Sequence, residues 1–462
     1  MSKDVIIGLE THIQLNTKSK MFCQCPTKGS DEPNTRTCEV CIGAPGSKPR
    51  INREVVNKAL SVALALNCEI NKRMTWDRKS YFYPDMSKNY QITQYDTPLG
   101  FKGKLKVNAR VIRIRRVHME EDPARLVHAG GDIRSSDYVK VDYNRSGTPL
   151  IEVVTEPDLR SPEGARDYLR SLLSILEHLG VFEPGDYTIK SDCNISIKGG
   201  QRVEVKNVSG LKDVEKALTY ELVRQRNLLK RGKKVKRGTR QFSPAGGTTY
   251  ALRTKESEMD YGYIVDPDLP WLVLTNKKIR RARGSLPELP AERVKRFIKE
   301  YGMNKEQAHT LVSDKALADF FEDCVKGYKD PTRIASWVDT QLLKCLNYQK
   351  QTIRESKVKP ESFMELIRLM DKGVITERLG KELIKDYVST GKSPKELVEE
   401  KGLGTLSDKE LKKVVKKVLK DNPDVNIKKD KKSINYLIGQ VLRATKGQAD
   451  PNKIRGLIKK EF

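Results

Sequence analysis

The chain has 462 residues, enough for about two to four domains, and 37% of them are apolar, which excludes global disorder. It carries 88 Lys and Arg against 61 Asp and Glu, and this formal charge of +27 points to a polyanionic partner such as nucleic acid. No run of apolar residues is long enough to span a membrane, and the opening "MSKDVIIG" enters a strand almost at once, so we expect a cytoplasmic protein that does not contact membranes.

The first predicted element is a strand at "GLETHIQL", residues 8–15, because apolar and polar residues alternate there with period two. One side holds Leu9, Thr11, Ile13 and Leu15, and the other holds Glu10, His12 and Gln14. If the outer side only contacted water, Lys or Ser would serve there equally well. A carboxylate and an imidazole two residues apart therefore indicate chemistry on that face.

A cysteine cluster follows the strand. Four of the eight cysteines, Cys23, Cys25, Cys38 and Cys41, lie within 19 residues as "CQC", twelve residues rich in turn formers, and "CEVC". In a reducing compartment such a cluster indicates a metal site rather than disulfides. Four thiolates can close a tetrahedron around zinc and leave no open position, so we predict a structural zinc knuckle at 23–41. The alternative is four reduced cysteines that lie together by chance.

The next motif, "WDRKSYFYPDMSKNYQITQYD" at 76–96, interleaves cations with aromatic residues. Arg78 and Lys79 stand beside Tyr81, Phe82 and Tyr83. This pattern suits a nucleotide with its phosphates. Packing of the aromatic residues in a core explains it about equally well.

Acidic residues then recur on predicted strand faces. In "RVHMEEDPAR", His118 and Glu120 are two residues apart and so share one face of a strand. In "PLIEVVTEPD", Glu152 and Glu156 are four residues apart and also share one face. Together with Glu10, His12, Asp192 and Glu204 they form a set that resembles hard oxygen ligands gathered on one face of a sheet. Such a face suits Mg²⁺ bound together with substrate phosphates. Each acid alone is more often simply solvated. No Walker loop and no Rossmann glycine pattern occurs, so any ATP site would be borne on the sheet.

"SPEGARDYLRSLLSILEHLG" at 161–180 predicts a helix with Ser161 as N-cap, Pro162 in the first turn and Gly180 as terminator. A hairpin follows at 187–207. A three-residue loop, 199–201, would oppose Ser196 to Glu204 and Ile195 to Val205. The polar face of this hairpin then holds Asp192, Asn194, Glu204 and Lys206.

Strand signals fade near residue 284, and helical patterns take over. Gly402 and Gly404 bracket a second break. Beyond it, residues 404–462 hold 16 Lys and Arg against 7 Asp and Glu, a difference of +9 in a helical pattern. We therefore predict three domains, 1–284, 285–403 and 404–462.

Several blocks carry a family resemblance over nearly the whole chain. They are "IGLETHIQLNTKSKMFCQCPTK", "NTRTCEVCIGAPGSKP", "DRKSYFYPDMSKNYQITQYD", "HMEEDPARL", "VDYNRSGTPLIEVVTEPDLRSPEGARDYL", "VEVKNVSGLKDVEKAL" and "LIGQVLRATKGQADPNKIRGLIKK". In this order they resemble the B-subunit family of aspartyl/glutamyl-tRNA amidotransferases. The large extra domain of the related E subunit has no room before the helical region, which favours the B-subunit family.

The resemblance implies an ATP-dependent ligase that phosphorylates the side-chain carboxylate of mischarged Asp-tRNA(Asn) or Glu-tRNA(Gln) and amidates it with ammonia. It implies an α+β fold, namely a glutamine-synthetase-like cradle with an antiparallel sheet, an all-helical domain and a small helical tail domain that binds tRNA. It also implies a heterotrimer with the glutaminase A subunit and a C subunit. The mischarging aminoacyl-tRNA synthetase is a further candidate partner.

The resemblance also implies roles for individual residues in the matching blocks. Glu10, His12, Glu120 and Glu152 are the expected catalytic and Mg²⁺-binding residues, and the four cysteines match the zinc knuckle. Arg78, Lys79, Asp192, Glu204 and Lys206 are further candidates for binding ATP and its metal. Which of the two charged tRNAs is the substrate depends on the cell's synthetases. The competing hypothesis is a nonenzymatic zinc-containing RNA-binding protein, which explains the charge and the cysteines but not the acidic strand faces.

Overall fold

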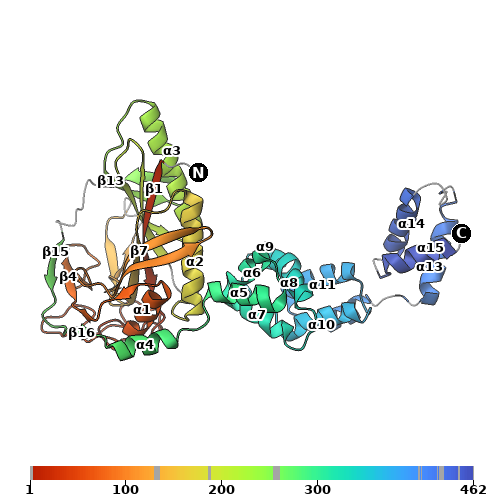
Figure 1. The fold of residues 1–462 in the computed structure, drawn as a ribbon, viewed down its shortest axis with the longest axis horizontal. Coiled ribbons are helices and arrows are strands. Elements are labelled where there is room, and N and C mark those ends of the chain that lie inside the picture. The colour runs from red at the N-terminus through yellow and green to blue at the C-terminus, as the bar shows by residue number, and fades with distance from the viewer. Residues whose placement is uncertain are drawn as a thin grey trace. The chain divides into compact units, whose positions relative to one another are not determined.

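The computed structural model describes residues 4–129, 136–185, 189–252, 261–403, 406, 408–423, 425, 431–445 and 448–460. It shows a mixed α/β protein that divides into two compact units, Met1–Pro290 and Ala291–Phe462 (Figure 1). The first unit contains the strands, and helices make up the described part of the second unit. The finer expectations, a glutamine-synthetase-like cradle and domain boundaries at 284/285 and 403/404, stay predictions.

A large sheet organises the first unit. Among the described residues it has nine strands in the order β14-β13-β12-β11-β1-β10-β7-β6-β2, and only β12 and β13 pair in parallel. Its strands are β1 (Val5–Gln14), β2 (Glu69–Ile70), β6 (Gly100–Val107), β7 (Arg110–Glu121), β10 (Pro149–Thr155), β11 (Ile189–Ile197), β12 (Val203–Ser209), β13 (Gly238–Ser243) and β14 (Thr248–Ala251). The strand predicted at residues 8–15 thus lies in the middle of the sheet.

Smaller sheets border the large one. They are β15 (Gly262–Val265) with β4 (Asp77–Ser80) and β5 (Tyr90–Thr93), then β16 (Leu272–Val273) with β3 (Arg73–Met74), and β8 (Arg125–His128) with β9 (Val139–Asp142). Strand β5 packs beside β7. The segment that interleaves cations with aromatic residues is therefore brought next to the polar end of β7.

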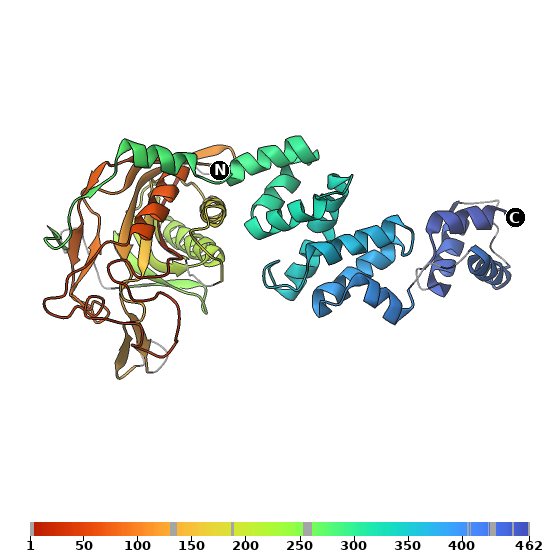
Figure 2. The same ribbon diagram turned by 90° about the horizontal axis from the view of Figure 1, so that it is seen from below.

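Helices cover one face of the large sheet. They are α1 (Arg53–Ala65), α2 (Pro162–His178) and α3 (Leu211–Lys230), while α4 (Asn276–Gly284) lies along α1 (Figures 1 and 2). The predicted start of α2 is confirmed, because the Ser161 hydroxyl accepts a hydrogen bond from Gly164 N at 3.1 Å and Pro162 occupies the first turn.

Alternation along β1 decides which face is buried. Leu9, Ile13 and the neighbouring Leu15 are buried in the core against these helices, whereas Glu10 and His12 on the opposite face are only half-buried. The same parity holds along β11, where Cys193 and Ile195 enter the core. The opposite face of the sheet is therefore free to carry polar groups, and we call it the polar face.

The predicted hairpin has the right faces but the wrong register. Asn194, not Ser196, opposes Glu204, and Ile195 pairs with Val203 rather than Val205. The pairing is shifted by two residues, so every side chain keeps its face. Alternation cannot distinguish two registers that differ by two residues, so the geometry of the turn decides between them. In this turn Gly199 has a φ of +87°, which glycine adopts readily.

The second unit contains helices over its described residues. They are α5 (Pro290–Tyr301), α6 (Lys305–Val312), α7 (Lys315–Val325), α8 (Pro331–Trp337), a π-helical turn (Val338–Leu342), α9 (Leu343–Gln349), α10 (Pro360–Asp371), α11 (Glu377–Thr390), α12 (Pro394–Lys401), α13 (Asp408–Lys420), α14 (Lys431–Ala444) and α15 (Pro451–Lys460). One core gathers apolar residues between Val294 and Val398, and another gathers those between Leu411 and Ile458. Among the described residues, no helix combines the length and the apolar character needed to cross a bilayer.

Candidate functional site

Three strands place a row of titratable side chains on the polar face. His12 on β1 pairs in register with Glu152 on β10, which pairs with His118 on β7. The distance to Glu152 Oε2 is 3.5 Å from His12 Nε2 and 3.1 Å from His118 Nε2. The row forms because directly opposed residues of antiparallel strands share a face. One carboxylate is therefore held between two imidazoles.

Glu120 completes this first group. It follows His118 by two residues on the same face of β7, and its Oε1 lies 3.4 Å from His12 Nε2. Glu120 and Glu152 are buried, whereas the His12 side chain is 26% exposed and opens the group to solvent. His12, Glu120 and Glu152 each offer a ligand atom, and these atoms all lie within 4.8 Å of one another.

Electrostatics couple the members of this group. Burial alone would lower the pKa of His12, but the carboxylates of Glu152 and Glu120 raise it to about 10. Burial would raise the pKa of Glu152, yet the imidazoles of His118 and His12 hold it well below its ordinary value. Burial raises the pKa of Glu120. The two carboxylates therefore favour the protonated form of the His12 imidazole.

A second group lies beside the first. Glu10 on β1 opposes Asp192 on β11, and Asn194 of β11 opposes Glu204 on β12. Glu10, Asp192 and Glu204 each offer an oxygen within 4.8 Å of the others. Asn194 Nδ2 donates a hydrogen bond to Glu10 Oε1 at 3.0 Å. The sequence placed Glu10, Glu152, Asp192 and Glu204 in one set, and the structure divides this set into two groups, with Glu10 beside Asp192 and Glu204.

Repulsion within the second group is substantial. Burial and the negative charges of Glu152, Asp192 and Glu204 raise the pKa of Glu10 to about 7. Burial also raises the pKa of Glu204. Three carboxylates at this spacing fit a hard divalent cation, because such a cation removes the repulsion and accepts oxygen ligands. The first group supplies two carboxylates and one imidazole, so the second set of donors fits Mg²⁺ better.

Arg78 is already engaged by acidic partners. Its Nε lies 2.8 Å from Asp266 Oδ2, its Nη2 lies 2.9 Å from Asp268 Oδ2, and its guanidinium carbon lies 4.4 Å from the Tyr90 ring centroid. The Asp266 side chain is fully buried. In the structure, Arg78 thus joins strand β4 to the segment after β15.

Lys79 follows Arg78 in β4, so its side chain lies on the opposite face of that strand. Its Nζ lies 4.7 Å from the Tyr261 ring centroid and 5.8 Å from that of Tyr81, and its positive charge lowers the pKa of Glu120 against the effect of burial. Lys79 therefore lies near the first acidic group. Lys206 is associated with the second group, because its Nζ lies 3.8 Å from Glu204 Oε1.

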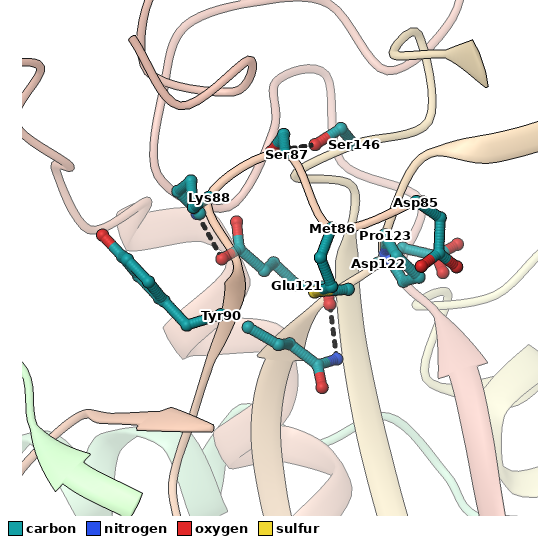
Figure 3. A pocket seen from close by; sticks show the side chains of 10 residues that line it. Asp85, Met86, Ser87, Lys88, Tyr90, Glu121, Asp122, Pro123 and Ser146 are labelled. Carbon is teal, nitrogen blue, oxygen red and sulfur yellow. Dashed lines mark hydrogen bonds and ion pairs between the residues drawn. The ribbon is translucent and has the colours of Figure 1, made fainter. Parts of the chain in front are cut away.

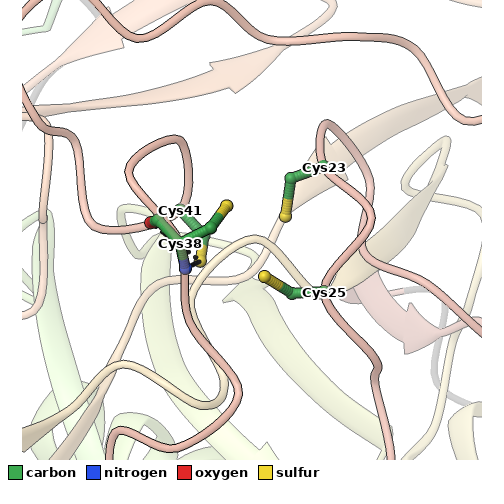
Figure 4. Close-up of side chains that lie close together, drawn as sticks. All are labelled: Cys23, Cys25, Cys38 and Cys41. Atoms are coloured by element: carbon green, nitrogen blue, oxygen red, sulfur yellow. Dashed lines mark hydrogen bonds between the residues drawn. The ribbon is translucent and has the colours of Figure 1, made fainter.

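The four clustered cysteines converge from two loops (Figure 4). Cys23 and Cys25 on one loop face Cys38 and Cys41 on the other, and the four sulfur atoms lie within 4.8 Å of one another. A hydrogen bond from Cys23 and the nearby Lys20 ammonium lower the pKa of Cys41 to about 4, although burial opposes this. Four converging sulfur atoms, one of them 3.4 Å from the Lys20 ammonium, fit a structural zinc ion.

The cysteine loops are tied to the end of β7 through a small polar pocket (Figure 3). The hydroxyls of Ser87 and Ser146 donate hydrogen bonds to the Cys41 carbonyl at 3.0 and 2.7 Å. Next to them Lys88 forms an ion pair with Glu121, the neighbour of Glu120. The knuckle thus supports the strand that presents the first acidic group.

Comparison with known proteins covers both units. The family described as GatB/GatE catalytic domain matches residues 5–280, a range that contains both acidic groups and the four cysteines, and the GatB domain family matches residues 319–462. The chain belongs to this B-subunit family. The motif-based resemblance is thereby confirmed.

Members of the B-subunit family align along nearly the whole chain. The aspartyl/glutamyl-tRNA(Asn/Gln) amidotransferase B subunit from Saccharolobus solfataricus is 46% identical over 469 residues, covering 99% of each chain. Its counterpart from Sulfolobus acidocaldarius is 46% identical over 471 residues, again covering 99% of each chain. The counterpart from Thermotoga maritima is 43% identical over 474 residues, covering 98% of each.

Sequence reasoning gave no role to three residues that support the site. His118 contacts Glu152, Asn194 holds Glu10, and Lys20, fully buried, places its Nζ 3.4 Å from Cys41 Sγ. For His118, the sequence did offer a signal, because His118 and Glu120 are two residues apart and share a face of β7. No pattern in the sequence marks Lys20, because only the folded loop brings it to the sulfur atoms.

Proposed function

We propose that this chain is the B subunit of a tRNA-dependent amidotransferase. In this role it uses ATP to phosphorylate the side-chain carboxylate of Asp-tRNA(Asn), Glu-tRNA(Gln) or both, and ammonia then converts the activated group to the amide. The observation that supports it most is the pair of acidic groups on one polar face, in a chain that aligns end to end with aspartyl/glutamyl-tRNA(Asn/Gln) amidotransferase B subunits.

The acidic groups suit phosphoryl transfer. Mg²⁺, when bound, would offset the charge of the ATP phosphates, and Glu10, Asp192 and Glu204 are the oxygen donors best placed to hold it, with His12, Glu120 and Glu152 beside them. His118 and Asn194 fix the orientation of Glu152 and Glu10. Such preorganised polar groups are the main means by which proteins catalyse this class of reaction.

The bonds made and broken follow from this chemistry. A carboxylate oxygen of the aminoacyl group bonds to the γ-phosphorus of ATP, and ADP leaves. The nitrogen of ammonia then bonds to the acyl carbon, and phosphate leaves. Lys79 lies near the first acidic group and offers an ammonium for phosphate oxygens. Arg78, which is held by two aspartates, serves in this scheme to fix strand β4.

Partners complete the reaction. We propose a glutaminase A subunit as the ammonia source, a C subunit as the third member of a heterotrimer, and a mischarging synthetase as the supplier of the charged tRNA. The basic segment 404–462 would add tRNA affinity, since it carries 16 Lys and Arg against 7 Asp and Glu. A cytoplasmic location follows from this role in translation. Zinc in the cysteine knuckle would be structural, because all four positions are filled by protein.

The decisive experiment combines the chain with its glutaminase and third subunits, mischarged tRNA, ATP and glutamine. We expect ADP release that depends on the charged tRNA and the appearance of amidated tRNA. Zinc-dependent RNA binding without ATP consumption would instead support the nonenzymatic alternative. Family membership does not favour that alternative, and it leaves the acidic groups unexplained.

A further inference from the structure

Lys20 is a lysine that has no contact with water. It lies in the chain between β1 and Cys23, and its exposed fraction is 0%. Lysine is almost never fully buried unless its charge is paired, because removing an ammonium from water is costly. The atoms around the Lys20 ammonium therefore indicate what this side chain is there to bind.

The partners of the Lys20 ammonium are a sulfur atom and a carbonyl group. Its Nζ lies 3.4 Å from Cys41 Sγ and donates a hydrogen bond to the Tyr143 carbonyl at 3.2 Å. Among the residues that the structure describes, no carboxylate forms an ion pair with Lys20, and the nearby Glu121 is already paired with Lys88. The neighbour that can carry the matching negative charge is thus the Cys41 sulfur.

The Cys41 sulfur receives N–H donors from two sides. Besides the Lys20 ammonium, the backbone N–H of Cys38 donates to it at 3.2 Å. Cys41 is buried, at 2% exposure, whereas the other three cysteines of the cluster are half-buried. Hydrogen bonds from charged donors are roughly twice as strong as those between neutral groups. Such donors stabilise negative charge on the sulfur, and the thiolate is the form of cysteine that binds metal.

Zinc bound by four thiolates is an anionic centre, because the four sulfur charges exceed the charge of Zn²⁺ by about two. Where the sulfur atoms are buried or half-buried, this excess needs a nearby cation, as any charge removed from water does. Lys20 is a cation that the structure places in contact with a sulfur of the cluster. Its charge would offset part of the excess.

The position of Lys20 is fixed from both cysteine loops. Its backbone N–H donates a hydrogen bond to the Cys25 carbonyl at 3.0 Å, while its ammonium reaches Cys41 on the other loop. Gly147 packs against both side chains, because a Cβ on Gly147 would lie 3.4 Å from Cys41 Cβ and 3.6 Å from Lys20 Cδ. Lys20 thus joins the two loops to the segment that leads into β10.

We propose that Lys20 is the counter-charge and positioning residue of a zinc centre at the four clustered cysteines. Its ammonium would hold Cys41 as a ligand, lower the net negative charge of the centre and tie the centre to the Tyr143 carbonyl. The proposal rests on the zinc site proposed above and is independent of the amidotransferase reaction. It explains a fully buried lysine by the charge of the metal centre rather than by catalysis.

The test compares zinc binding by the full chain and two variants. Lys20→Met removes the ammonium and keeps a long, flexible side chain in the buried position. The matched control, Lys18→Met, makes the same change at an exposed lysine two residues earlier. Affinity is measured by competition with a chromophoric chelator. Each protein is also loaded with Co²⁺, whose sulfur-to-metal charge-transfer band reports the electron density on the sulfur ligands.

We expect Lys20→Met to bind zinc about 10- to 100-fold more weakly than the wild type, the range typical of residues that support metal ligands. Its Co²⁺ band should move to longer wavelength, since a sulfur that has lost a hydrogen-bond donor releases charge more easily. Lys18→Met should match the wild type in both measurements. A purely structural role for Lys20 would lower the melting temperature alone, so wild-type affinity with an unshifted band in Lys20→Met overturns the proposal.

The wild-type chain separates this proposal from the zinc site itself. A wild-type chain that takes up no zinc refutes the site and this proposal with it, whereas zinc uptake by the wild type with an unaffected Lys20→Met refutes the proposal alone. If the variant does not fold, the crystal structure of the zinc-loaded wild type decides. Lys20 Nζ within hydrogen-bond distance of Cys41 Sγ supports the proposal, and an ammonium turned away from the sulfur overturns it.

Discussion

His12 and Glu152 oppose each other across β1 and β10, and Nε2 of the histidine lies 3.5 Å from Oε2 of the glutamate. Glu152 also contacts His118 from the other side, at 3.1 Å. Side chains from three strands thus meet at one carboxylate, and a change on any of these strands should be felt at the site.

Removing either of two carboxylates should abolish the phosphorylation step. Glu10→Gln and Glu152→Gln keep the side-chain size but remove an anionic metal ligand, so we expect a loss of several kcal/mol of transition-state stabilisation, roughly a thousandfold in rate. The measurement is tRNA-dependent ADP release by the reconstituted complex. Basal glutaminase activity of the A subunit should survive, and Glu163→Gln, an exposed change in the first turn of α2, is the control. Wild-type rates in both variants would assign these acids a structural role.

Loss of His118 should weaken cation binding without removing a proposed ligand. His118 is buried and holds Glu152 in place, so His118→Leu frees that carboxylate to turn. Residues that orient metal ligands typically contribute about 10- to 100-fold in affinity. Calorimetric titration with Mg²⁺ should show such a decrease, while the exposed His309→Gln should leave affinity unchanged. Equal affinities for all three proteins would contradict a positioning role for His118.

The cysteine knuckle should hold about one zinc ion per chain. Metal analysis of carefully prepared protein tests this directly, and less than a tenth of an equivalent would refute it. Cys23→Ser should lower thermal stability, because a structural zinc contributes its binding free energy to folding. It should also lower activity indirectly, since Ser87 and Ser146 bond to the Cys41 carbonyl beside Glu121. The control is Cys345→Ser in α9, which should retain the full zinc content.

Deleting residues 404–462 should weaken tRNA binding but leave the chemical step intact. The segment carries 16 cations against 7 anions, and fewer counterions are displaced without it. We expect a flatter salt dependence of tRNA affinity and a higher KM for tRNA, with kcat retained at saturating tRNA. Salt titrations of the deleted and full chains give the comparison. Superimposable curves would count decisively against the idea.

The sequence alone determined the elements and faces of the site. Period-two alternation put Glu10 and His12 opposite the buried residues of β1, and the spacing of Cys23, Cys25, Cys38 and Cys41 predicted a cluster whose sulfur atoms do converge. Parity also gave the correct faces of the hairpin that carries Asp192. These inferences succeed because a side chain's face depends only on its position along one strand.

The tertiary structure alone decided which side chains meet. The order of strands puts β10 between β1 and β7, so Glu152 lies between His12 and His118, while Glu10 joins Asp192 and Glu204 in a second group. The two-residue error in the hairpin register has the same origin. Strand order and register depend on contacts between segments distant in sequence, and parity is unchanged by a shift of two residues. Local periodicity could therefore place each carboxylate on the polar face but could not assign its neighbours.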